Sequence, residues 1–199
     1  MNGDIVAKWG PISFSRTEVR DLLTAWIAIS LAFTIAMGGP FLQGFVIAAI
    51  TAGLGFLLHE LGHKVVAQHY GAWAEFRSFG VMLLVGVALA LFGIIFLAPG
   101  AVMISGRTIG TTRNGKISAA GPAMNFALAL LFLLAPWPLV RAYGFQINAW
   151  LGLFNLIPFA PFDGAKVWAW NKAIYLVMVL VGIAAVGFSG FLMGGNSFA

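Results

Sequence analysis

Cysteine is absent from the 199 residues of this chain, which excludes disulfides and thiolate metal ligands. Charge is also scarce, because only 9% of the residues are Asp, Glu, Lys or Arg, compared with about a quarter in a soluble domain. Hydrophobic residues make up 61% of the chain. The low charge and the high hydrophobic content predict an all-α polytopic membrane protein.

The few charges are biased in sign, with eleven Lys and Arg against six Asp and Glu, and a net charge of +5. In a membrane protein such an excess reports on orientation, because basic loops stay on the cytoplasmic side. We therefore expect the lipid bilayer, and no nucleic acid, as a partner of the basic residues. The sequence leaves the oligomeric state open.

Long apolar stretches predict about five to six transmembrane helices, since a span needs about 20 residues. Residues 1–16 form a polar segment without a signal-peptide pattern, so we expect the first helix to stay as an anchor. We expect one domain over residues 1–199, without a PDZ or CBS domain. The predicted spans are Thr17–Met37, Phe45–His69, Ile117–Ala135, a stretch from about Gln146 that prolines interrupt, and Lys172–Leu192, with Phe79–Ala98 as the uncertain sixth.

Local signals mark several element boundaries. Ser15 and Glu18 have the spacing of a capping box at the start of the first helix. Ile12–Phe14 is compatible with a short strand, and so is Ala101–Ser105. Gly38-Gly39-Pro40 is expected to end the first helix and Gly71 the second.

The run Phe79–Ala98 decides the topology, because every later loop changes side if it crosses the membrane once. If it does not cross, ten basic residues lie on or near one side and only Arg141 lies opposite; if it crosses, the split is six against five. The positive-inside rule favours a re-entrant or interfacial hairpin, bent near Gly86 or Gly93. The ten residues are Lys8, Arg16, Arg20, Lys64, Arg77, Arg107, Arg113, Lys116, Lys166 and Lys172.

The sequence His59-Glu60-Leu61-Gly62-His63 contains the residues that predict a catalytic metal site. On a helix, His59 and His63 are one turn apart and can bind one metal ion, while Glu60 beside them can act as a general base. A Glu and two His inside an apolar run are costly in lipid and usually functional. A chance match is the alternative, but the chain has only three His in all.

A catalytic zinc site needs a third protein ligand. Asp163 is the best candidate, because Pro158 and Pro161 open the backbone before it and a lone carboxylate in such a break needs a partner. The alternative for Asp163 is an interfacial helix cap paired with Lys166. Two weaker candidates are His69, expected at a helix end, and Glu75, expected in a polar loop as a solvated pair with Arg77.

Three motifs resemble the site-2 protease family of intramembrane zinc metalloproteases, especially its small prokaryotic and archaeal members. They are HELGH at the end of a predicted span, Gly121-Pro122-Ala123-Met124-Asn125, and Asn155 to Gly164 in the pattern N-x-x-P-x-x-P-x-D-G. They occur in the family's order over about Phe45 to Lys166. The long insert Phe79–Ala98 departs from a minimal member of the family.

The resemblance implies one zinc ion per chain, bound by His59, His63 and Asp163, with Glu60 activating the water. It also implies that Asn155 helps to hold the oxyanion. Asn125 would contact the substrate, and a short strand containing Ala101, Val102 and Met103 would pair with it near the active site.

The implied activity is hydrolysis of peptide bonds in or near transmembrane segments of membrane-protein substrates. The implied location is the cell membrane, multi-pass, with the active site open toward the cytoplasm. Two non-catalytic alternatives are a pseudoprotease that captures membrane helices and a metal-handling membrane protein. Neither of these requires a base, so the intact Glu60 favours the protease.

Overall fold

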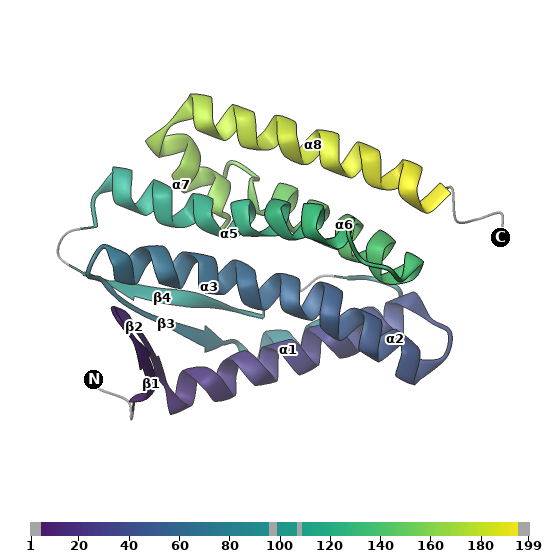
Figure 1. Ribbon diagram of the computed structural model, residues 1–199. Helices are drawn as coiled ribbons and strands as arrows, with labels where there is room; N and C mark the ends of the chain where they lie inside the picture. The colour runs from purple at the N-terminus through teal and green to yellow at the C-terminus, as the bar shows by residue number, and fades with distance from the viewer. Residues whose placement is uncertain (1–4, 96–98, 107–108, 195–199) are drawn as a thin grey trace. The chain divides into compact units, whose positions relative to one another are not determined.

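The computed structural model describes residues 5–95, 99–106 and 109–194, and the chain divides into two compact units, Met1–Thr108 and Ile109–Ala199 (Figure 1). Helices dominate both units, and two small two-stranded sheets lie in the first. The expectation of a single domain over 1–199 stays a prediction.

The first unit begins with a hairpin, in which β1 (Ile5–Trp9) pairs antiparallel with β2 (Ile12–Ser15). The predicted strand is thereby confirmed, while its partner β1 was not predicted. Helix α1 (Arg16–Met37) follows, and the Ser15 hydroxyl accepts a hydrogen bond from the Glu18 amide at 3.2 Å. The predicted N-cap is therefore present, and Gly38, at φ 68°, ends the helix where expected.

The second long helical stretch carries HELGH and begins at Phe41, four residues before the predicted start. It consists of α2 (Phe41–Ala48), a π-helical turn η1 (Ala49–Gly53) and α3 (Leu54–His69). The π turn is stabilised from α1, because the Trp26 indole donates to the Ala49 carbonyl at 3.0 Å. Gly71, at φ 73°, follows the helix end as predicted.

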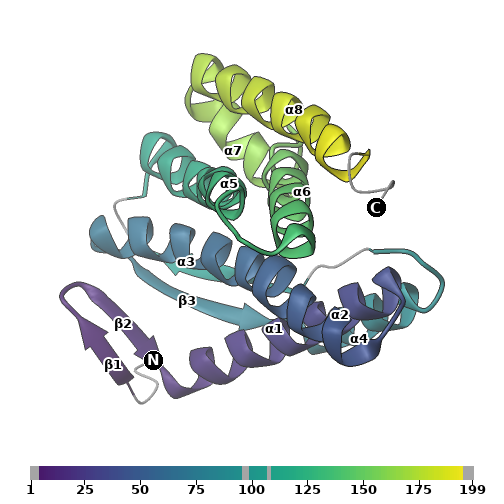
Figure 2. The ribbon, with the colours of Figure 1, turned by 45° about the vertical axis from the view of Figure 1, so that its right-hand side comes forward.

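Two antiparallel strands, β3 (Trp73–Ser78) and β4 (Gly100–Ser105), pack beside α3 (Figure 2). The strand predicted at Ala101–Ser105 is confirmed. The polar loop predicted around Glu75 is wrong, because this segment is β3 and Glu75 is buried there with its charge paired to Arg77. Glu75 pairs with Met103 of β4, far away in the sequence, and this pairing overrides the local polarity of the segment.

The apolar run between these strands starts and ends at neighbouring points, since the Phe79 amide donates to the Pro99 carbonyl at 2.9 Å. It contains α4 (Gly80–Ala90) and a turn at Gly93, which has a φ of 74°. An 11-residue helix is about 16 Å long, roughly half of a bilayer core. This geometry agrees with the expected hairpin, although its re-entry into a membrane stays a prediction; residues 96–98 of the run, and Arg107 after it, lie outside the described residues.

Four helices lie in residues 109–194, the described part of the second unit: α5 (Thr111–Phe132), α6 (Pro138–Asn155), α7 (Asp163–Trp170) and α8 (Lys172–Gly194). Helix α5 starts six residues earlier than predicted, through the polar segment. Helix α6 starts eight residues before the predicted Gln146, because Pro138 occupies its first position, where the missing amide costs nothing. A small core of Ala129, Phe145 and Ala149 holds α5 and α6 together.

Four helices in the described residues are long and apolar enough to cross a membrane: α1, the stretch Phe41–His69, α5 and α8. Several small side chains are buried in the first two, including Ala25, Ala32, Ala48 and Ala52, and small residues allow helices to approach closely in membranes. The predicted count of five to six spans is thus not confirmed, and α6, with 18 residues, is not among the four.

Candidate metal centre

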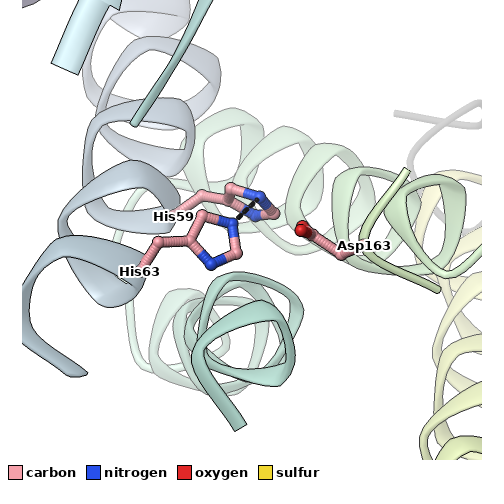
Figure 3. Close-up of side chains that lie close together, drawn as sticks. All are labelled: His59, His63 and Asp163. Atoms are coloured by element: carbon pink, nitrogen blue, oxygen red, sulfur yellow. Dashed lines mark hydrogen bonds between the residues drawn. The ribbon is translucent and has the colours of Figure 1, made fainter. Parts of the chain in front are cut away.

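The two histidines of HELGH occupy one face of α3, one turn apart. Their Nε2 atoms are 3.0 Å apart, their rings are nearly perpendicular, and both side chains are buried (Figure 3). Two imidazole nitrogens that bind one tetrahedral zinc at about 2.0–2.1 Å are separated by about 3.3 Å. The pair therefore fits a shared metal ion with only a small adjustment of the rings.

Glu60 lies directly after His59 on α3 and is also buried. Its Oε2 accepts a hydrogen bond from the backbone amide of Val102 on β4, at 3.2 Å. The carboxylate is thus held by the sheet beside the histidine face. A carboxylate placed next to two metal-binding imidazoles is suited to accept a proton from a water molecule.

Asp163 is the first residue of α7 and is buried. The segment 156–162 that precedes it is non-helical, as its prolines predicted. Gly164 follows, and a Cβ there would overlap the carbonyl of Leu156, so the start of α7 is packed against the end of α6. The alternative partner Lys166 is present at 3.8 Å, but its side chain is 45% exposed, and such surface pairs contribute little.

Among the described residues, one group of three His, Cys, Asp or Glu side chains could hold a metal ion, and it consists of His59, His63 and Asp163 (Figure 3). The two weaker candidates are not members of this group. His69 is exposed at the end of α3 with its ring against Tyr70, and the Glu75 carboxylate is paired with Arg77. The donor set of two imidazoles and one carboxylate is of the kind that holds catalytic zinc.

The two asparagines that we expect to act on the substrate form hydrogen bonds with other groups of the second unit. The Asn155 side chain, at the end of α6, donates to the Leu151 carbonyl at 2.9 Å. Asn125 is fully buried on α5 and donates to Asn148 on α6 at 3.0 Å. Their catalytic and substrate-binding roles stay predictions. Asn148 was not singled out from the sequence, although a buried amide in an apolar helix is a signal for a polar partner.

The fold and the site describe a helical protein with four candidate membrane spans among its described residues and a group of two histidines and one aspartate that could hold a metal ion. No family model and no solved structure matches the chain. It is 40% identical to "Putative zinc metalloprotease MJ0611" of Methanocaldococcus jannaschii over 189 residues, which cover 90% of this chain and 96% of that relative. The chain therefore belongs to the same family as this metalloprotease.

Two further relatives are longer proteins of which the chain matches about a third. "Putative zinc metalloprotease Rip3" of Mycobacterium tuberculosis is 32% identical over 66% of this chain and 33% of its own length. "Zinc metalloprotease MJ0392" of Methanocaldococcus jannaschii is 29% identical over 56% of this chain and 30% of its own length. All three relatives carry names that contain the words zinc metalloprotease.

Proposed function

We propose that this chain is an intramembrane zinc metalloprotease of the site-2 type, which hydrolyses peptide bonds in or near transmembrane segments of membrane-protein substrates. The observation that carries the proposal is the buried turn of α3 on which Glu60 stands beside the paired imidazoles of His59 and His63. The membership in a family of zinc metalloproteases supports the same activity.

His59, His63 and Asp163 are the residues that would hold one zinc ion per chain, and their chemistry fits it. Two neutral imidazoles and a carboxylate match the donor sets of catalytic zinc, with a further position left for water or substrate. Zinc supplies, when bound, a Lewis acid that lowers the pKa of water and polarises a carbonyl group.

Glu60 is the general base in this proposal. Its carboxylate takes a proton from the attacking water and delivers it to the nitrogen of the leaving amine, so the same group serves both halves of the hydrolysis. Asn155 would donate its amide hydrogen to the developing oxyanion. To do so it must give up its bond to the Leu151 carbonyl, which lies one turn back on the same helix.

The substrate must be unwound before it can be cut, because a transmembrane helix hides its amides in internal hydrogen bonds. The outer edge of β4 would compensate by pairing with the extended substrate. Val102 is not an open pairing position in this state, since its amide is bound to Glu60. Ile104, two residues further, presents its backbone to the same edge, and exposed Met103 and half-buried Ala101 flank Val102 along the strand.

The basic residues support an active site that opens toward the cytoplasm in a multi-pass cell-membrane protein. The apolar run between β3 and β4 supports the same orientation, because a hydrogen bond joins its two ends. A segment that returns to its starting point leaves the later loops on the same side of the membrane. Lys64 does not count among the basic residues that indicate orientation, because Glu18 neutralises its charge inside the protein.

The proposal is tested with detergent-purified protein and a panel of single-span peptides, each incubated with and without a zinc chelator. We expect cleavage within the apolar segment of at least one peptide, its loss in chelator and its return with added zinc. The variant Asp163→Ala should lose zinc in elemental analysis. Unchanged zinc content in this variant would remove Asp163 from the site, and cleavage that resists the chelator would refute the metalloprotease mechanism.

A further inference from the structure

A fully buried ion pair joins α1 to α3 next to the metal-binding residues. The Lys64 ammonium lies 2.7 Å from both carboxylate oxygens of Glu18, and the two side chains are 1% and 0% exposed. The third ammonium proton goes to the Ala74 carbonyl of β3 at 2.9 Å. Lys64 directly follows His63, so this pair fixes the turn of α3 that carries the site.

Glu18 also reaches the sheet, because its Oε1 accepts a hydrogen bond from the Phe76 amide of β3 at 3.0 Å. Phe76 lies directly opposite Val102 of β4 in the register of the sheet. The Val102 amide points to the other edge and donates to Glu60. The amides of these two paired residues therefore each donate a hydrogen bond to a glutamate, one from each edge of the β3–β4 sheet.

These contacts form a connected path from Lys64 through Glu18 to Phe76, across the pairing of β3 with β4 to Val102, and on to Glu60. Glu60 and Lys64 are four residues apart on α3, so both ends of this path lie on the same face of that helix, one turn apart. The sheet is held at both edges by groups anchored to α3. A shift of β3 relative to α3 would move the Val102 amide away from the Glu60 carboxylate.

Attachment of α3 to β3 does not by itself require the ion pair. The Gln68 side chain, one turn after Lys64, already donates to the same Ala74 carbonyl at 3.1 Å and contacts Ser13 of β2. What the ion pair adds is Glu18, whose carboxylate reaches the residue opposite Val102. Charge-assisted bonds of this kind are shorter and stronger than neutral ones and tolerate less displacement.

We propose that Glu18 and Lys64 are positioning residues, whose buried pair sets the β3–β4 sheet so that the Val102 amide orients the Glu60 carboxylate. The part of this inference that concerns catalysis rests on the proposed protease function. The part that concerns the position of β4 against α3 does not.

The first test measures position. The double variant Glu18→Gln/Lys64→Met removes both charges together, and the glutamine oxygen can still accept from Phe76. Spin labels on Val65→Cys and Met103→Cys, at exposed sites of α3 and β4 in this cysteine-free chain, report their separation. We expect the double variant to shift or broaden the distance distribution, while the control Gln68→Leu, which removes only the neutral tie, leaves it as in the parent.

The second test measures turnover in unlabelled protein with zinc content determined in parallel. We expect kcat to fall by about 100-fold in the double variant, the cost of a displacement of about 1 Å in a catalytic geometry. KM and zinc content should stay within about twofold of the parent, and Gln68→Leu should keep its kcat.

An unchanged distance distribution in the double variant, or an equal change in Gln68→Leu, would overturn the positioning role. A changed distribution with unchanged kcat would refute its link to Glu60. If the parent protein cleaves no substrate at all, the proposed function fails, and the distance measurement still decides whether the ion pair positions β4.

Discussion

Replacement of Gly164 by alanine should weaken zinc binding without unfolding the protein. A Cβ at this position would lie 2.5 Å from the Ile157 carbonyl oxygen, about 1 Å inside the about 3.5 Å of a favourable contact. The atoms in the way are backbone atoms of Leu156 and Ile157, which cannot rotate aside. The start of α7, including Asp163, must therefore move by about 1 Å, whereas metal–ligand distances tolerate about 0.2 Å.

We expect the zinc affinity of Gly164→Ala to fall by about 10- to 100-fold, as for groups that orient a metal ligand. Competition with a chelator of known affinity measures this change. Gly187→Ala is the matched control, because Gly187 lies in α8 with nothing within 4 Å of its added Cβ, and its zinc affinity should be that of the parent. Equal affinities for the two variants would refute the argument that Gly164 positions Asp163.

Three further predictions follow from the site and the topology. Asn155→Ala should keep zinc and lower kcat by about 10²- to 10³-fold, the usual effect of removing an oxyanion donor, and a kcat near that of the parent would exclude Asn155 from this role. Ile104→Pro should lose cleavage while Ile104→Ala retains it, if the β4 edge pairs with substrate through its backbone; equal activity of the two folded variants would exclude pairing at this position. In intact cells, an impermeant thiol reagent should label Leu139→Cys and not Thr111→Cys, and labelling of the latter would refute the hairpin topology.

The sequence was sufficient where the determining signal is local. The Ser15 cap, the glycine stops at Gly38 and Gly71, and the helical spacing of His59 and His63 each depend on residues within one or two turns. The strand β4 was also predicted, since a short apolar segment between a Pro-Gly break and a polar loop has few alternatives.

What was missed depends on partners far away in the chain. The sequence around Glu75 predicts a polar loop, and only its pairing with β4 makes it a strand. Lys64 was counted among the basic residues on one side of the membrane, but it is buried in the structure. Its partner Glu18 lies 46 residues earlier, where it fits a capping box; in the structure the Glu18 amide completes the cap while its carboxylate binds Lys64. Local patterns cannot show such a double use of one residue, because the second partner is fixed only by tertiary packing.

The most direct test of the central claim is the turnover of Glu60→Gln on a cleavable single-span substrate, with zinc measured in the same sample. The amide is close in shape to the carboxylate but cannot accept the proton of the attacking water. We predict one zinc per chain, as in the parent protein, and a loss of kcat of about 10²-fold or more. A variant that holds zinc and still turns over at a rate near that of the parent would contradict the assignment of Glu60 as the base of a zinc protease.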